Sequence, residues 1–372
     1  MYLSSLKLEN FRNYANLELK LEPNDGIVIL LGSNAMGKTN ILEAISLLAF
    51  PRSFRANSPS DLIKFEQNHY LIEGQIEPPE GRAMNLKIGY QRKPIRRVYY
   101  INSGEVSLKE YLTNFQTVLF TPEDLEILSG APNLRRRLID TILSQVDREY
   151  FEYLVGFSKV LKQRNALIKK YKERKVSEIE IKFWNEELIR LSGKIHQYRV
   201  EFIEYCSQQL PDIYRQISSE ENNEVAIIYK FSGQNRCHNG ENYEDAFREL
   251  IQSEFRREVE AGHTLFGPHR DDFELMLNSR SVAEFCSRGE KRSFSLALKF
   301  IEINFLQFKS KSKPVLLLDD VFSELDEERR KKLLDLSLNF QTIITTVEKN
   351  YFSDYKNQIQ VYTVKNSQLT KM

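Results

Sequence analysis

The chain has 372 residues, of which 41% are hydrophobic, so it can bury one large core or two. Its 53 basic and 52 acidic residues nearly cancel to a net charge of +1, so any surface for nucleic acid must be a local patch. Cys206, Cys237 and Cys286 lie far apart, which excludes a disulfide framework and favours a reducing cytoplasm. No apolar run reaches the ~18 residues that span a bilayer, so we expect a cytoplasmic protein without a membrane partner.

Two strands are expected first, over residues 1–8 and 17–21, with a turn at Asn10–Tyr14 between them. A hairpin close to a phosphate-binding segment can bring Arg12 to a bound nucleotide, where its guanidinium would stabilise γ-phosphate charge. The alternative for Arg12 is a solvent-exposed arginine in a turn. We carry it as a candidate ATP-binding residue.

A glycine-rich segment with the spacing GxxxxGK[ST] follows, and it predicts a site for a nucleoside triphosphate. An apolar strand over 26–31 precedes it, and a helix with apolar positions at helical spacing follows over 40–50. In that setting Lys38 reaches the β- and γ-phosphates and Thr39 binds Mg²⁺, whereas a chance glycine turn would need neither residue. The predicted ATP-binding residues of this segment are Gly32, Ser33, Asn34, Ala35, Met36, Gly37, Lys38, Thr39 and Asn40.

A basic loop at Pro51–Arg55 comes next, which either reaches a ligand or is only surface. Strand-like pieces over 70–76, 84–90 and 97–101 then predict an antiparallel meander beside the nucleotide-binding sheet. A short apolar strand at 118–120 ends this part. After it, we expect a helix with Thr121 as N-cap and Pro122 at its first position.

The middle of the chain is predicted to be helical. Apolar residues recur at steps of three and four over 150–171 and again over 181–205, which is the pattern of two packed helices. The short polar stretch 172–177 joins them, so we predict an antiparallel helical hairpin. Arg135, Arg136 and Arg137 are consecutive and must spread around their helix, so only some of them can face one ligand.

The stretch 159–175 holds eight basic residues and the single acid Glu173, which makes it the most basic segment of the chain. It is either a solvated helix face or a surface that follows the phosphates of nucleic acid. Because Tyr171 is the single aromatic residue among these basic residues, too few for a series of stacked bases, duplex or junction backbone is favoured over sequence readout. The DNA-binding candidates are Lys159, Lys162, Arg164, Lys169, Lys170 and Lys172.

A strand over 224–231 and a helix over 243–259 are expected before the chain returns to the sheet. His269 lies in a polar turn, and a hydrogen-bonded turn histidine is favoured over a metal ligand because no histidine pair has metal spacing. The sequence Ser287-Arg288-Gly289-Glu290 then opens a helix that runs to Phe305. Alone, this serine-glycine motif is weak.

The apolar strand 313–320 ends in two carboxylates and has the form of a Walker B element. Asp319 would hold Mg²⁺ beside Thr39, and Asp320 would orient or deprotonate the attacking water together with Lys38 as the catalytic pair. The alternative, a buried strand whose acids cap the next helix, does not account for both carboxylates together with the phosphate loop. A helix over 327–338 and a strand over 342–347 follow, and the hydroxyl of Thr345 is a candidate contact for the γ-phosphate.

The motifs together resemble the ABC-type ATPase heads of the SMC and RecF group, and within it the RecF family. The residues that carry the resemblance span nearly the whole chain in the family's order: Asn10–Asn13, Gly32–Asn40, Thr121–Leu125, Arg135–Asp140, Gly267–Asp272, Ser287–Glu290 and Leu316–Asp326. The resemblance implies an α/β fold class, with an ATPase head of mixed sheets and flanking helices and an inserted, mainly helical lobe that contains the antiparallel hairpin. It assigns 1–121 and 260–372 to the head and 122–259 to the lobe.

The resemblance further implies a weak DNA-dependent ATPase that uses ATP and Mg²⁺. ATP would join two copies, with Ser287 and Gly289 of one subunit at the γ-phosphate held by Lys38 of the other, and with Asp326 in the D-loop at the same site. In the family, this homodimer clamps double-stranded DNA near single-strand gaps. It cooperates with RecR and RecO to load RecA in recombinational repair, replication restart and the SOS response.

The chain departs from the family pattern at two places. Glu290 stands where the signature has glutamine, and a carboxylate near a triphosphate is unfavourable unless it points away. The Q-loop glutamine has no clear counterpart other than Glu123. Two alternatives remain, an ATPase subunit of a transport complex and a regulator of a nuclease. The basic helical arm disfavours the first, and because the chain ends soon after Thr346 we expect no attached nuclease domain.

Overall fold

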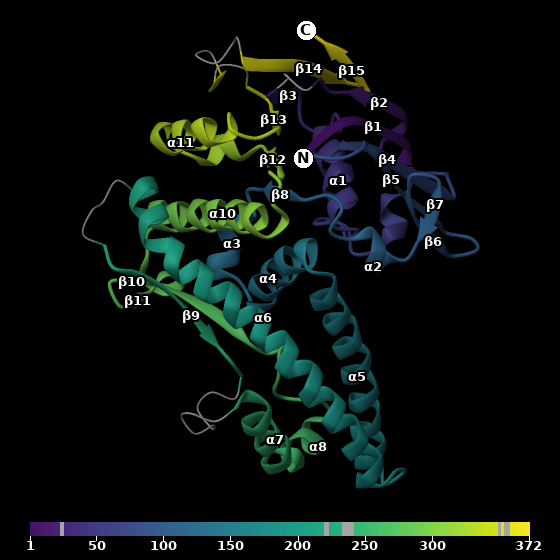
Figure 1. Ribbon diagram of the computed structural model, residues 1–372, viewed down its shortest axis with the longest axis vertical. Coiled ribbons are helices and arrows are strands. Elements are labelled where there is room, and N and C mark those ends of the chain that lie inside the picture. Colours follow the sequence, from purple (N-terminus) through teal and green to yellow (C-terminus); the bar gives the residue numbers. More distant parts are fainter. Residues whose placement is uncertain (23–25, 219–222, 233–241, 349–350, 353–357) are drawn as a thin grey trace. The chain divides into compact units, whose positions relative to one another are not determined.

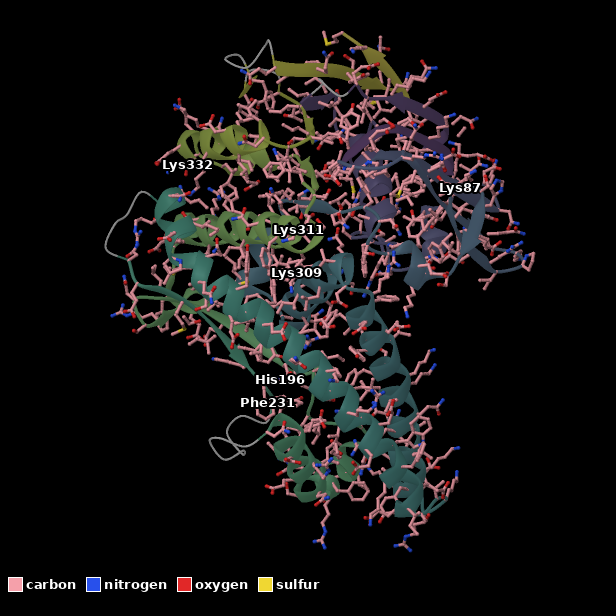
Figure 2. All side chains as sticks on the ribbon, in the orientation of Figure 1. Lys87, His196, Phe231, Lys309, Lys311 and Lys332 are labelled. Carbon is pink, nitrogen blue, oxygen red and sulfur yellow. The ribbon has the colours of Figure 1, made fainter. Side chains whose placement is uncertain are left out.

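The structure is a computed structural model that describes residues 1–22, 26–218, 223–232, 242–348, 351–352 and 358–372. The chain forms two compact units, one made of Met1–Asp124 with Leu296–Met372 and the other of Leu125–Ser295. Figure 1 shows the elements of each unit, and Figure 2 adds their side chains. Cys237, one of the three cysteines considered above, lies outside the described residues. Among the described residues, no helix is both long and apolar enough to cross a membrane.

The first unit contains a mostly parallel six-stranded sheet in the order β15-β14-β3-β13-β12-β8, of which only β15 pairs antiparallel. Strands β3, β12 and β13 are buried along nearly their whole length because both faces of a parallel sheet are covered. The strands are β3 (Ile27–Leu31), β8 (Thr117–Phe120), β12 (Val315–Asp319), β13 (Thr342–Thr346), β14 (Ile359–Lys365) and β15 (Gln368–Lys371).

A second six-stranded sheet of the same unit is antiparallel, in the order β2-β1-β4-β5-β6-β7. It contains the predicted N-terminal hairpin and the predicted meander, so both expectations are confirmed. Its strands are β1 (Tyr2–Phe11), β2 (Tyr14–Lys20), β4 (His69–Glu77), β5 (Met84–Gln91), β6 (Arg96–Ile101) and β7 (Gly104–Val106).

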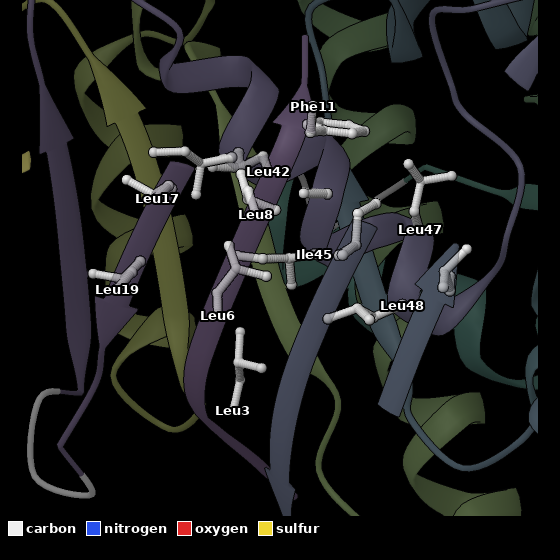
Figure 3. Packing of buried hydrophobic residues seen from close by; sticks show 14 of the residues in the cluster. Leu3, Leu6, Leu8, Phe11, Leu17, Leu19, Leu42, Ile45, Leu47 and Leu48 are labelled. Carbon is white, nitrogen blue, oxygen red and sulfur yellow. The ribbon is translucent and has the colours of Figure 1, made fainter. Parts of the chain in front are cut away.

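Helix α1 (Lys38–Ala49) contributes to the hydrophobic core of this unit together with strands of both sheets. Figure 3 shows leucines of β1 and β2 facing Leu42, Ile45 and Leu48 of α1. The alternation of β1 buries its apolar residues on one face and leaves the charged ones outside. This packing fixes α1 directly after the glycine-rich segment. Other helices of the unit are α2 (Leu108–Tyr111) and α11 (Glu327–Ser337).

The second unit is built around the predicted helical hairpin, which is confirmed. Helix α5 (Arg148–Lys172) packs along α6 (Glu178–Ser218), and the polar connection has the expected position. A three-stranded antiparallel sheet joins β11, β10 and β9 in that order. The remaining elements are α4 (Pro132–Val146), β9 (Val225–Lys230), α7 (Tyr243–Ser253), α8 (Phe255–Ala261), β10 (Asp272–Leu277), β11 (Arg280–Ser281) and α9 (Val282–Phe285).

The boundary between the lobe and the C-terminal head lies later than the predicted 259/260. Strand β10 pairs with β9 of the second unit along its whole length, and Asp272 forms an ion pair with Arg135 of α4. The following helix α10 (Arg288–Ser310) begins in the second unit and ends in the first. The sequence signalled the strand but not its pairing partner.

Two local predictions are wrong. Helix α3 (Asp124–Ser129) begins three residues after Thr121, because the Asp124 carboxylate accepts from the Thr121 backbone N–H at 2.6 Å and closes a turn before the helix. The single helix expected over 243–259 is two helices, α7 and α8, which are separated at Glu254.

Candidate nucleotide-binding site

The glycine-rich segment adopts a conformation that depends on its glycines. Gly37 has φ of +102°, and a Cβ there would lie 2.4 Å from the Asn13 side chain. A Cβ at Gly32 would lie 2.5 Å from the backbone carbonyl of Val364. Neighbouring atoms lie so close to the backbone of both glycines that no side chain fits at either position. The loop can therefore turn tightly into the N-terminus of α1.

The N-terminal hairpin holds this loop from outside. Asn13 donates to the carbonyl of Met36 at 3.3 Å and accepts from the Asn40 amide at 2.7 Å. The hydroxyl of Tyr14 donates to the carbonyl of Gly37 at 3.1 Å, and burial raises the pKa of Tyr14. Sequence reasoning missed these two supports, because nothing in the local pattern pairs β1 and β2 with the loop.

The Lys38 side chain lies inside the loop. Its ammonium donates to the carbonyls of Gly32 at 2.6 Å and Ser33 at 2.9 Å, and the residue is only 6% exposed. Burial lowers the pKa of Lys38, an effect opposed by the nearby carboxylates of Asp320 and Asp319. A cation is therefore held by carbonyls of the loop at the N-terminus of α1, an arrangement suited to phosphate.

The predicted metal-binding residues meet. Thr39 at the start of α1 donates to the Asp319 carboxylate at the end of β12, with 2.8 Å between Oγ1 and Oδ1. These are hydroxyl and carboxylate oxygens, the donor types that Mg²⁺ uses when phosphates supply the other ligands. The pair therefore fits Mg²⁺. Among the described residues there is no group of three or more acidic, histidine or cysteine side chains for a metal held by protein alone.

Thr345 at the end of β13 contacts both acidic residues of the predicted Walker B element. Its hydroxyl donates to Asp319 Oδ1 at 2.7 Å and accepts from the backbone N–H of Asp320 at 3.0 Å. Thr345 is fully buried, with 0% exposed surface. Its one hydroxyl proton is therefore used on Asp319, which differs from the predicted contact with a γ-phosphate.

Asp320 follows the strand in a left-handed conformation with φ of +54°. Burial raises the pKa of Asp320, and the neighbouring charge of Asp319 adds to this, while Lys38 opposes it. A carboxyl group with a raised pKa is a better proton acceptor when ionised. The strained backbone and the shifted pKa are both features of residues at functional sites.

Arg12 is engaged by protein rather than free to reach a ligand. Its guanidinium makes a two-pronged ion pair with Glu43 of α1, with both N–O distances 2.8 Å, and also donates to the carbonyl of Asp61. The hydrogen bond to Glu43 raises the pKa of Arg12. Glu43 is fully buried and also accepts from Ser53, so the sequence interpretation missed the partner that fixes Arg12.

The predicted signature residues cap α10. Ser287 Oγ accepts from the Glu290 N–H at 3.2 Å, and the Glu290 carboxylate accepts from the Ser287 N–H at 2.7 Å. This reciprocal pair is a capping box, for which Ser-x-x-Glu is the sequence signal. Glu290 therefore points back at its own helix, which accounts for the acidic residue in this position.

The other predicted ATP-binding residues are distributed as follows. Ser33, Asn34 and Ala35 are exposed on the loop, and Asp326 is the N-cap of α11, where it accepts from the Arg329 N–H at 2.9 Å. Gly289 lies in the first turn of α10. Glu123 is exposed in the turn before α3. The turn histidine is confirmed, since a ring nitrogen of His269 lies 3.3 Å from the carbonyl of Thr264.

The DNA-binding candidates on α5 divide into two groups. Lys159, Lys162, Lys169, Lys170 and Lys172 are exposed. Arg164 is fully buried, and it forms an ion pair with Glu258 at 2.6 Å and hydrogen bonds with Asn185 and Thr264. The prediction that Arg164 faces DNA is therefore wrong, because its guanidinium is enclosed by the protein.

The chain matches the model of the RecF/RecN/SMC N-terminal domain family over residues 2–370. It is 33% identical to the DNA replication and repair protein RecF of Natranaerobius thermophilus, over 100% of this chain and 98% of the relative. It is 34% identical to the RecF of Caldanaerobacter subterraneus, over 94% and 95% of the two chains.

Solved structures agree with this similarity. A structure of the recombination mediator protein RecF with ATP, from the RecFOR pathway, superposes with a TM-score of 0.90 at 31% identity, over 100% of this chain and 97% of the other. A structure of an Smc head bound to the C-terminal winged-helix domain of ScpA superposes with a TM-score of 0.56 at 18% identity, over 100% and 98%, which concerns the fold alone. The predicted ABC-type ATPase head is confirmed.

Proposed function

This chain belongs to the RecF family within the RecF/RecN/SMC group of ABC-type ATPases, and from that membership and the site we propose that it is an ATP-gated DNA clamp. In this proposal it binds and slowly hydrolyses ATP and dimerises on ATP. It binds double-stranded DNA near single-strand gaps. It thereby promotes loading of a recombinase in repair and replication restart.

The observation that carries the proposal is the meeting of the phosphate loop with the Walker B strand. Thr39 and Asp319 are 280 positions apart in sequence and 2.8 Å apart at their oxygens. Lys38 lies in the same loop as Thr39 and is buried among its carbonyls. We assign Gly32–Asn40 to the phosphates of ATP and Thr39 with Asp319 to Mg²⁺, which would neutralise charge on the phosphates when bound.

Hydrolysis is assigned to Asp320. Its carboxyl has a raised pKa, and its backbone is fixed by the Thr345 hydroxyl, so it is held where β12 ends. In the proposal this carboxylate accepts a proton from the attacking water, and Lys38 binds the phosphate that carries the developing charge. The weak, DNA-dependent character of the activity is part of the proposal.

Dimerisation is assigned to Ser287 and Gly289. In the described structure the Ser287 hydroxyl accepts from Glu290 but its own hydrogen has no acceptor, so it can donate to a phosphate of a second copy. A Cβ at Gly289 would meet nothing closer than Ser287 Oγ at 3.9 Å. The chain itself therefore does not require glycine there, and close approach by a nucleotide held on a partner copy gives a reason for it.

DNA binding is assigned to the exposed lysines of α5. At about 100° per residue, the five lysines fall within about 160° of the helix circumference, with Arg164 on the opposite side. A row of ammonium groups on one helix face follows a phosphate backbone without reading its sequence. The proposed partners are therefore double-stranded and gapped DNA, and membership of the family adds RecR and RecO in the cytoplasm.

The test is the affinity for a gapped duplex with ATP, with ADP and without nucleotide, measured for the wild type and for Ser287→Arg. The variant keeps the phosphate loop but places a bulky cation where two copies would meet. ATP should tighten DNA binding by the wild type, and Ser287→Arg should bind ATP normally without that gain. Size measurement with ATP should show a dimer for the wild type alone.

A matched control is Arg280→Ala, which removes an exposed arginine of the same unit away from the helix N-terminus. It should behave like the wild type. If neither protein binds DNA, or if nucleotide leaves the affinity of the wild type unchanged, the clamp is refuted. The transport and nuclease-regulator readings would then be the ones to test.

A further inference from the structure

Three lysines occupy alternate positions at the end of α10 and in its connection to β12, in the sequence Lys309-Ser310-Lys311-Ser312-Lys313. All three are exposed, and Lys309 and Lys311 are labelled in Figure 2. Each ammonium lies over a phenylalanine ring, with distances to the ring centroid of 5.7 Å for Lys309 over Phe305, 4.7 Å for Lys311 over Phe308 and 5.6 Å for Lys313 over Phe340. We call these three lysines and three phenylalanines the lysine ledge.

The lysine ledge has no acidic neighbours in sequence. Residues 303–318 and 336–347, which contain the ledge, include no Asp or Glu. None of the three lysines forms an ion pair within the described part of the chain. By contrast, Lys7 and Lys20 lie within 3.9 Å of Glu18, and Lys87 lies 3.0 Å from Glu73. The positive charge of the ledge is therefore not offset by the protein.

Structural roles account for only part of the ledge. Lys309 lies in the last turn of α10, where a cation is favourable beside the helix C-terminus. Lys313 donates to the carbonyl of Asn339 at 2.9 Å. Within the described part of the chain Lys311 has neither role; it has φ of +57°, and its ammonium lies over the ring of Phe308, itself 53% exposed. The rings hold the ammonium groups in place without neutralising them.

The ledge is distinct from the nucleotide site. Lys313 lies just before the first residue of β12, Val315, whereas Asp319 is the last residue of that strand. A strand of this length spans about 16 Å. The ledge therefore lies at the N-terminal ends of the parallel strands, and the phosphate loop lies at their C-terminal ends. No glycine-rich turn or helix N-terminus lies in the ledge, so it lacks the backbone donors of a nucleotide site.

We propose that the lysine ledge is a second DNA-binding surface, on the ATPase unit, that contacts the phosphate backbone of DNA extending beyond the clamp. A row of fixed, unpaired cations matches an anion whose charges repeat along a chain. This inference rests on the proposed DNA clamp.

The test compares the wild type with the triple variant Lys309→Gln, Lys311→Gln and Lys313→Gln, with ATP present. Affinity for a gapped duplex with long flanks is measured over a range of salt concentrations. Loss of three phosphate contacts should reduce the slope of log affinity against log salt by about 2.7. Between about 50 and 200 mM salt the wild type should then lose about 40-fold more affinity than the variant.

Two further variants make the result specific. The control Lys7→Gln, Lys20→Gln and Lys87→Gln removes the same charge from lysines that face carboxylates, and it should keep the wild-type slope. Lys309→Arg, Lys311→Arg and Lys313→Arg keeps the charge and should also keep the slope. ATP binding and thermal unfolding of every variant are measured in parallel.

The outcomes separate this inference from the proposed function. If the wild type binds DNA with ATP but the glutamine variant has the same affinity and slope, the ledge does not bind DNA, and an acidic protein partner would be the next ligand to test. If the wild type binds no DNA, the clamp itself is refuted. An equal reduction of the salt slope in the control variant would also overturn the inference, because the change would then follow from the lower net charge of the protein and not from the ledge.

Discussion

The hydroxyl of Thr345 is predicted to position the Walker B carboxylates rather than to touch ATP. Thr345→Val keeps the branched shape of the side chain and removes the hydroxyl alone. The backbone N–H of Asp320 keeps a second acceptor, the Thr345 carbonyl at 3.2 Å, so losing its hydrogen bond to the hydroxyl costs little stability. Asp319 loses a donor at 2.7 Å, and a hydrogen bond to a charged group contributes about 1.5–3 kcal/mol. We therefore expect about 2 kcal/mol less stability.

The assay separates positioning from binding. ATP turnover and the affinity for ATP are measured for Thr345→Val and for Thr345→Ser, and unfolding is followed with denaturant. The valine variant should lose turnover while its ATP affinity stays close to that of the wild type, and the serine variant should recover both turnover and stability. Normal turnover in a valine variant that is folded, or a loss confined to ATP affinity, would refute the reasoning.

Three further predictions concern stability. Arg164→Met should cost about 3–5 kcal/mol in denaturant unfolding because Glu258 stays buried without its cation, whereas exposed Arg190→Met should cost under about 1 kcal/mol. Burial lowers the pKa of His196 to about 4, so between pH 6.5 and 4 the unfolded chain binds more protons than the folded one. The free energy of unfolding therefore decreases as the pH is lowered through this range. His196→Phe should reduce that slope by about 1.4 kcal/mol per pH unit in acid titrations of stability, and an unchanged slope would contradict it. Glu290→Ala should lose about 1 kcal/mol of thermal stability and Glu290→Gln much less, since glutamine can still accept from Ser287.

Local sequence patterns predicted the elements that build the site. The spacing of Gly32, Lys38 and Thr39 specified a loop between a strand and a helix, and the run that ends in Asp319 specified a buried strand. These signals are local because the chemistry requires fixed residue types at fixed separations. Which strand neighbours which is not local, and for that reason the boundary near 259 was misplaced: β9 and β10 are joined through pairing between distant residues.

The hydrogen-bond partners of the site could be predicted only in part. Ser287 and Glu290 carry the capping-box signature, so the direction of the Glu290 carboxylate was available from the sequence. The pairing of Arg12 with Glu43 was not, because it depends on how the hairpin meets α1. The contact between Thr345 and Asp319 also depends on how distant elements meet. Its place at the end of β13 was predictable, but the direction of its hydroxyl is set by register with β12.

The basic segment of α5 shows how a pattern of charge and a pattern of burial must be combined. Buried positions run from Phe157 through Val160 and Arg164 to Ile168 in steps of three and four, so Arg164 falls on the apolar stripe of its helix. A basic residue on such a stripe needs a buried acidic partner, which is Glu258. Charge count alone assigned Arg164 to DNA. The position of Arg164 around the helix excludes it as a DNA-binding residue and leaves five exposed lysines on one face. The proposed contact with the DNA backbone is therefore limited to these five residues and can be tested more directly.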